Sequence, residues 1–236
     1  MFIYGGSSGV GQFGIQLAKL SGYKVVTVAS PRNHEFLRGL GADAIFDVCT
    51  PTLRSTFSIL VADTRARLTL QYRDSDMVQK VKEVAGNKIS HVLDTVAGND
   101  TQFASVKVLA EDKPGKVVIV LPHAEGIQDV RKDVQVTSSS TPEPSTRSKP
   151  LTSLLSVTVI NIFTSYGFGY AALGPDEDAR RVLSAFLQRV PGLIRDGKLK
   201  HIPVNKFDGG LEKVISDGFD YIAKGKVSAE KIVFGV

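Results

Sequence analysis

Short apolar segments alternate with segments of helical periodicity over the first half of the chain. Strands are expected at 2–4, 24–29, 44–46, 91–93 and 116–120, and helices at 10–20, 34–40, 77–84 and 103–109. In the first of these helices apolar side chains recur at helical spacing from Val10 to Leu20, and Gly22 provides a stop signal, as Gly41 does for the second helix. This regular alternation predicts an α/β fold of Rossmann type, a doubly wound parallel sheet with helices on both faces.

The last third of the chain carries helical patterns at 179–194 and 211–223 and a final strand at 231–234. These elements predict a C-terminal helix–strand extension of the Rossmann unit. Residues 137–150 (TSSSTPEPSTRSKP) are rich in Ser, Thr and Pro, so we expect a flexible loop there. An apolar strand is expected after it, at 156–164.

Residues 48–71 interrupt the alternation between a finished strand and the next helix. Val48-Cys49 can be encoded GTATGT, which resembles a splice donor, and Gln71 can be encoded CAG, which resembles an acceptor. Our hypothesis is a retained short intron translated in frame. The alternative is a tolerated surface insertion, since the entropy cost of closing a loop grows slowly with its length.

Composition and charge exclude several classes of protein. The net charge of +5 forms no basic run interleaved with aromatic residues, which argues against nucleic-acid binding. The single cysteine excludes an internal disulfide, and the four histidines lie far apart, so no metal site is expected. The longest apolar runs are strand-sized and no signal-peptide pattern is present. We therefore expect a cytoplasmic protein without a membrane span.

The segment 5–11 (GGSSGVG) joins the first strand to the first helix. Such a corner exposes backbone N–H groups at the positive end of a helix, where a diphosphate can bind. Glycines let the backbone turn tightly and approach the phosphates closely. A tight turn without a ligand can have the same composition, but the strand–helix–strand context favours a dinucleotide site. The predicted cofactor-binding residues here are Gly6, Ser7, Ser8, Gly9, Val10 and Gly11.

The residues that follow the second strand indicate which dinucleotide is bound. Sites that prefer NAD usually place a carboxylate there, for the ribose hydroxyls. This chain instead has Ser30, Arg32 and Asn33, whose side chains can donate hydrogen bonds to a 2′-phosphate. NADPH is therefore favoured over NADH. The alternative is that Arg32 is a solvated residue at a helix start and Asn33 only a cap.

The order of motifs resembles the medium-chain dehydrogenase/reductase superfamily. The stretches YGGSSGVGQFGIQLAKLSGYKVVTVASPRN, LGADAIFD, YRDSDMVQKVKEVAGNKISHVLDTVAG and GGLEKVISDGFDYIAKGKVSAEKIVF are similar to its zinc-free, NADPH-dependent branch. Within it, fungal enoyl reductases that act in trans with polyketide synthases are the most similar. Short-chain dehydrogenases share the glycine spacing, but no tyrosine here has the lysine four residues later that they need.

The resemblance implies an oxidoreductase that delivers a hydride from NADPH to an activated C=C bond of a small enoyl or quinone-like substrate, free or carrier-bound. It implies that Tyr72 lies near the adenosine phosphate and that Leu121 and Pro122 approach the nicotinamide. Asp94 and Thr95 end the fourth strand, where they are either a contact in the crevice or a strand-end turn. No catalytic residue or proton donor is assigned.

The resemblance also suggests the domain organisation. Residues 1–165 would be the dinucleotide-binding domain, and 166–236 a segment that completes a GroES-like catalytic domain expected ahead of the first strand. Without that domain, the C-terminal segment would expose an apolar face, and a homodimer is expected through 156–164. The alternatives to an active reductase are a non-catalytic nucleotide-binding remnant and an unstable gene-model fragment.

Overall fold

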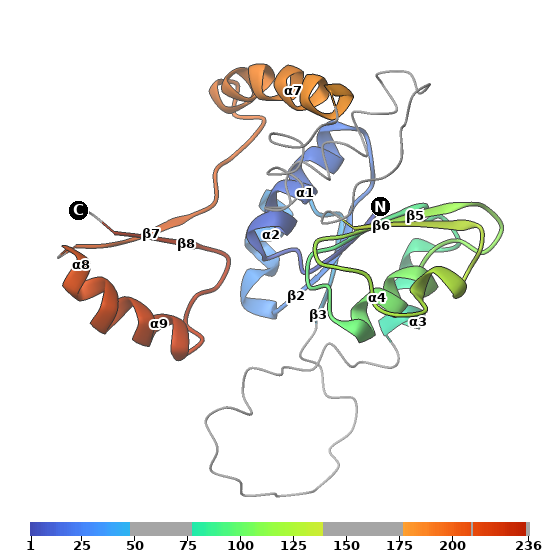
Figure 1. Cartoon of the computed structure of the whole chain (residues 1–236), viewed down its shortest axis with the longest axis horizontal. Helices are drawn as coiled ribbons and strands as arrows, with labels where there is room; N and C mark the ends of the chain where they lie inside the picture. The colour runs from blue at the N-terminus through green and yellow to red at the C-terminus, as the bar shows by residue number, and fades with distance from the viewer. Residues whose placement is uncertain (48–76, 139–176, 209, 235–236) are drawn as a thin grey trace, which may run out of the picture.

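The computed structural model describes residues 1–47, 77–138, 177–208 and 210–234 (Figure 1). The Rossmann unit contains β1 (Phe2–Tyr4), α1 (Gly9–Leu20), β2 (Val26–Ala29), the 3₁₀ turn η1 (Pro31–Asn33), α2 (His34–Gly39), β3 (Ala44–Asp47), α3 (Met77–Ala85), β4 (His91–Asp94), α4 (Asn99–Lys107), β5 (Gly115–Ile119), η3 (Ile127–Asp129) and β6 (Val134–Ser138). The strands and helices that were predicted over these ranges are confirmed, with ends that differ by a few residues.

The sheet has six strands, all parallel, in the order β3-β2-β1-β4-β5-β6. This is the strand order of a doubly wound dinucleotide-binding fold. The order reverses between β1 and β4, and at such a switch point the loops that follow the two strands part and leave a crevice. The predicted fold class is therefore confirmed.

Helices cover both faces of the sheet, with α1 and α2 on one side and α3 and α4 on the other (Figure 1). Alternate residues of β1 enter two separate cores, because successive side chains of a strand point to opposite faces. Phe2 and Tyr4 pack in the core that includes Met77 of α3 and Val106 of α4. Ile3 packs in the core formed with α1 and α2. Burial on both faces explains the continuous apolar runs of these strands.

Glycines in a left-handed conformation end the first two helices. Gly22 has φ +83° and follows α1, and Gly41 has φ +111° and follows α2. The amides of Gly22 and Tyr23 donate to carbonyl groups of the last turn of α1, at Lys19 and Ala18. This closure of the helix end confirms the predicted stop signals.

The predicted flexible loop at 137–150 is wrong for its first two residues. Thr137 and Ser138 belong to β6, pair with Val118 and Ile119 of β5, and are buried. Ser138 Oγ also donates a hydrogen bond to the carbonyl oxygen of Leu121, at 2.8 Å. Pairing with β5 provides hydrogen bonds for the backbone, and the bond to Leu121 satisfies the Ser138 hydroxyl group. A Ser/Thr composition is therefore compatible with a strand here. The rest of that loop, the expected strand 156–164, the expected domain boundary at 165 and the interruption at 48–71 lie outside the described residues.

The C-terminal part consists of α7 (Glu177–Arg195), β7 (Val204–Phe207), α8 (Gly210–Lys213), the π-helical segment η4 (Val214–Gly218), α9 (Phe219–Ala223) and β8 (Lys231–Phe234). Strands β7 and β8 form a separate two-stranded parallel sheet beside the continuous helical run from α8 to α9 (Figure 1). The predicted helix–strand extension is confirmed, whereas β7 was not predicted.

One face of this extension is open to solvent, as the sequence suggested. Ile215, Phe219 and Ile222 recur at helical spacing and are 62%, 61% and 51% exposed. On the other side, Gln16 of α1 ties the extension to the Rossmann unit. Its Oε1 accepts from the amide of Lys200 at 2.6 Å, and its Nε2 donates to the Lys200 carbonyl at 3.1 Å.

Candidate functional site

The corner between β1 and α1 brings together all six predicted residues of the glycine-rich segment. Gly5 adopts φ +80°, and the amide of Ser8 donates to the Gly5 carbonyl at 3.0 Å, which closes the turn. Ser8 is the N-cap of α1, and its Oγ accepts from the amide of Gly11 at 2.9 Å. The amides of Gly9 and Val10, in the first turn of the helix, have no acceptor within it. They are therefore free to bind an anion at this corner.

The close approach of backbone segments explains the glycines. A Cβ on Gly11 would lie 2.3 Å from the carbonyl oxygen of Gly5, and one on Gly6 would lie 2.3 Å from Thr27 Oγ1. Neither distance leaves room for a side chain. Gly9 is exposed, and a Cβ on it would lie 3.2 Å from Ile202 Cδ1, which is closer than ordinary contact. The corner has the shape that a dinucleotide diphosphate requires.

The end of β2 carries the three residues predicted to bind a 2′-phosphate. Ser30 and the exposed Arg32 lie at the start of the 3₁₀ turn, directly after β2. Within the described ranges, Arg32 takes part in none of the ion pairs. Asn33 is buried at the N-cap position of α2, but its side chain makes no capping hydrogen bond there.

The Asn33 side chain instead binds the C-terminal extension. Its Nδ2 donates to Ser228 Oγ at 3.1 Å, and Ser228 Oγ lies 3.3 Å from Asn33 Oδ1. The Tyr221 hydroxyl of α9 donates a hydrogen bond to Glu230, which raises the pKa of this hydroxyl, and the positive charge of Arg32 offsets a small part of the increase. The extension therefore borders the region after β2.

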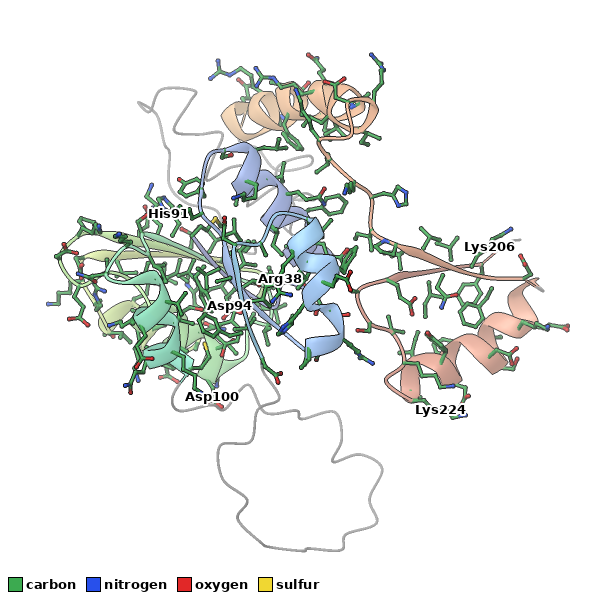
Figure 2. The ribbon with its side chains drawn as sticks, turned by 180° about the vertical axis from the view of Figure 1, so that it is seen from behind. Arg38, His91, Asp94, Asp100, Lys206 and Lys224 are labelled. Atoms are coloured by element: carbon green, nitrogen blue, oxygen red, sulfur yellow. The ribbon has the colours of Figure 1, made fainter. Side chains whose placement is uncertain are left out.

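Asp94 and Thr95, at the end of β4, lie beside the glycine corner across the switch point. Asp94 is fully buried in the middle of the Rossmann unit (Figure 2). Its Oδ1 accepts from the amides of Val96 and Ala97, at 3.0 and 2.8 Å, and its Oδ2 accepts from Thr101 Oγ1 at 2.8 Å. Burial raises the pKa of this carboxyl, and the hydrogen bonds offset part of the increase. Asp94 thus organises the loop and does not face the crevice.

Leu121 and Pro122 follow β5 at the same edge of the sheet. Leu121 is 41% exposed, which is high for a large apolar residue beside the core. Its loop is held by Ser138 and by Gln102, whose Nε2 donates to the Pro122 carbonyl at 3.2 Å and whose Oε1 accepts from the amide of Ala124 at 2.7 Å. A fixed backbone that presents an exposed apolar side chain suits contact with a flat ring.

The loops after β1, β2 and β5 therefore place three predicted groups of residues at the carboxyl edge of one sheet. A family model for zinc-binding dehydrogenases matches residues 9–128, which begin with α1 and include this edge. The chain belongs to the zinc-binding dehydrogenase family.

Individual relatives of this dehydrogenase-family chain agree with that assignment. The trans-enoyl reductase xenG of Xenoacremonium sinensis is 30% identical over 236 residues, which cover 99% of this chain and 52% of the relative. The solved structure of CurK enoyl reductase matches with a TM-score of 0.61 at 17% identity, over 99% of this chain and 54% of that chain. Mycobacterial Rv1454c complexed with NADPH matches with a TM-score of 0.55 at 15% identity, over 99% and 55%.

These matches confirm the resemblance and the fold that were inferred from the sequence. The chain spans about half the length of the curated relative it matches. Among the described residues of this dehydrogenase-family chain, no three His, Cys, Asp or Glu side chains come close enough to hold a metal ion. Within the same ranges, no helix combines the length and the apolar character needed to cross a bilayer.

Two features of the site were not predicted from the sequence, and one predicted residue lies outside the described residues. Ser228 was missed because nothing in its local pattern indicates that the C-terminal extension reaches Asn33. The link from Thr95 to Ser8 was also missed, although both strand ends were identified, because no local pattern indicates that β1 pairs with β4. Tyr72, predicted beside the adenosine phosphate, lies outside the described residues.

We expect Gly11→Ala to destabilise the protein by about 1–3 kcal/mol, the range typical of overpacked sites. The added methyl group would overlap the Gly5 carbonyl, which is backbone and cannot move without opening the turn. Thermal unfolding measures the effect. Gly39→Ala is the matched control, because no atom lies within 4 Å of its Cβ position, and its Tm should be unchanged or higher. Equal Tm values for the two variants would contradict the tight corner.

The buried carboxyl of Asp94 should make stability depend on pH. Because burial raises its pKa, the folded state holds the proton at a higher pH than the unfolded chain. This contribution is complete below the ordinary carboxyl pKa of about 4 and is lost as pH rises through the raised pKa. Asp94→Asn carries no such titration, so wild type should gain stability relative to the variant as pH falls from about 7 towards 4. Urea unfolding at several pH values tests this, and a constant difference would argue against it.

Proposed function

We propose that this chain forms the coenzyme-binding part of an NADPH-dependent oxidoreductase of enoyl reductase type. The observation that carries the proposal is the corner after β1, where the amides of Gly9 and Val10 lack helical acceptors at a topological switch point. Ser7 and Gly6 complete the turn around this position. The name of the trans-enoyl reductase relative supports the reaction type.

NADPH is proposed over NADH on the residues after β2. Arg32 is exposed there without an ion-pair partner in the described part of the chain, and no carboxylate occupies the position that would bind ribose hydroxyls. Ser30 adds a hydroxyl group beside Arg32, whereas the backbone amide of Asn33 donates to the Ser30 carbonyl and its side-chain amide donates to Ser228. A guanidinium group binds a phosphate through parallel hydrogen bonds, whereas it gains less from a neutral hydroxyl.

The reaction proposed is reduction of an activated C=C bond in a small enoyl or quinone-like substrate, free or carrier-bound. Bound NADPH would supply the hydride for the β-carbon, and a proton would then be added at the α-carbon. The residues of this chain act by holding the coenzyme. The corner binds the diphosphate, and the loop at Leu121 presents an apolar side chain to the nicotinamide ring, which orients its reactive face.

Arg32→Ala should weaken NADPH binding by about ten-fold or more and leave NADH binding nearly unchanged, since only NADPH carries the 2′-phosphate. Isothermal titration calorimetry with each coenzyme measures both constants. Arg38→Ala is the control, because Arg38 is also exposed and belongs to the helix that follows the turn (Figure 2). An equal loss of affinity for the two coenzymes in Arg32→Ala would count against a 2′-phosphate site.

Turnover should be visible as oxidation of NADPH in the presence of an enoyl thioester or a quinone, with the reduced product identified by mass spectrometry. Binding of NADPH without turnover would point to a nucleotide-binding protein that does not catalyse. Binding of neither coenzyme to folded protein would overturn the proposal. A Tm increase with NADPH, measured in parallel, establishes that the protein is folded and that the coenzyme binds the native state.

A further inference from the structure

We propose that Thr95 is a positioning residue of the coenzyme site. Its hydroxyl group holds Ser8 as the cap of α1 and so reserves the amides of Gly9 and Val10 for the diphosphate. The inference rests on the proposed function, because it assigns a role at the same corner.

A directed chain of hydrogen bonds carries the inference. The amide of Gly11 donates to Ser8 Oγ at 2.9 Å, and Ser8 Oγ donates to Thr95 Oγ1 at 2.8 Å. Thr95 Oγ1 in turn donates towards the carbonyl oxygens of Tyr4 and Gly5, at 2.7 and 3.0 Å. The last residue of β1, the turn and the first residues of α1 are thus joined through one threonine from another strand.

The number of protons available in this chain of hydrogen bonds determines whether the Ser8 hydroxyl can donate to a phosphate. A hydroxyl group has one proton, and the proton of Ser8 is directed at Thr95. Ser8 Oγ cannot donate to a phosphate while that bond persists. It acts as an acceptor that satisfies the third amide of the helix, whereas the amides of Gly9 and Val10 keep their donor capacity. Thr95 therefore separates the capping role from the ligand-binding role.

Thr95 itself is held rigidly at the end of β4. Its amide donates to the carbonyl of Tyr4 at 3.1 Å, which extends the pairing of β1 with β4 by one step. The two following amides, of Val96 and Ala97, are bound by the buried Asp94. A Cβ on Gly5 would lie 2.6 Å from Thr95 Oγ1, so the hydroxyl group is packed directly against the turn. A fixed hydroxyl at this place defines where Ser8 Oγ stands.

The experiment is a double-mutant cycle on coenzyme binding, with Thr95→Val, Ser8→Ala and the double variant of the full chain. Thr95→Val keeps the shape of the side chain and removes the hydroxyl group. It should weaken NADPH and NADH by the same factor, about five-fold, because the diphosphate is common to both. If Thr95 acts through Ser8, the double variant should bind no more weakly than Ser8→Ala. Thr95→Ser, which restores the hydroxyl group, should recover wild-type affinity.

Thr101→Val is the matched control. It removes another buried hydroxyl group, from helix α4 directly after the same loop, one that binds Asp94 and makes no hydrogen bond to Ser8. It should lower the Tm without changing either binding constant. If Thr95→Val does not fold, Thr95→Ala takes its place in the double-mutant cycle with Ser8→Ala.

The results separate this inference from the proposed function. Wild-type protein that binds neither coenzyme would defeat the proposed function itself. Wild-type binding together with unchanged affinity in Thr95→Val, or additive losses in the double variant, would overturn the role of Thr95 alone.

Discussion

The site depends on how closely the start of α1 can approach the end of β1. The carbonyl of Gly5, the Cα of Gly6 and the Cα of Gly11 meet at distances that exclude a side chain. This contact places the first turn of the helix at the carboxyl edge of the sheet, where the amides of Gly9 and Val10 have no acceptor within the helix. A longer side chain at these positions would move the helix away, and the amides would lose their common direction.

The surrounding structure holds this contact from three directions. Strand β4 supports it through Thr95 and, one layer further in, through the buried carboxylate of Asp94. Strand β2 supports it from the other side, since the amide of Gly6 donates to the carbonyl of Val28. The C-terminal extension reaches the same edge through the pairing of Asn33 with Ser228. Buried polar groups, which cost free energy unless they are hydrogen-bonded, therefore fix the backbone around this corner through their hydrogen bonds.

Local sequence patterns were sufficient for most of the Rossmann unit. Glycines with positive φ at positions 22 and 41 end helices as expected, and the β-branched runs form strands as expected. The errors arise where long-range contacts override composition. Thr137 and Ser138 form a strand because β5 offers them a ladder, and Asn33 binds Ser228 instead of capping its own helix. Neither partner is a sequence neighbour, so periodicity and propensity contain no signal for them.

The parts of the candidate site that follow from a local pattern were predictable, and the parts that depend on long-range contacts were not. The glycine corner and the residues after β2 were predicted because a phosphate site needs specific residue types at fixed places in a strand–helix–strand unit, and their role in binding stays a prediction. For Thr95 the sequence predicted only its position at the end of a strand. Its hydrogen bond with Ser8 depends on the pairing of β1 with β4. Leu121 was located through a family resemblance, and its exposure in the structure agrees with a surface contact.

The position of β1 in the middle of the sheet has a consequence for the synthesis of the protein. Phe2 pairs with Val26 on one side and with Val92 on the other, so this strand is completed by a strand that is made much later in translation. Until then one edge of an entirely apolar strand stays unpaired and open to neighbouring chains. Because Ser8 and Thr95 meet only when β4 docks, the hydrogen bonds around the corner are completed only after that event. The emerging polypeptide thus passes through an interval in which the turn after β1 has no support from Thr95.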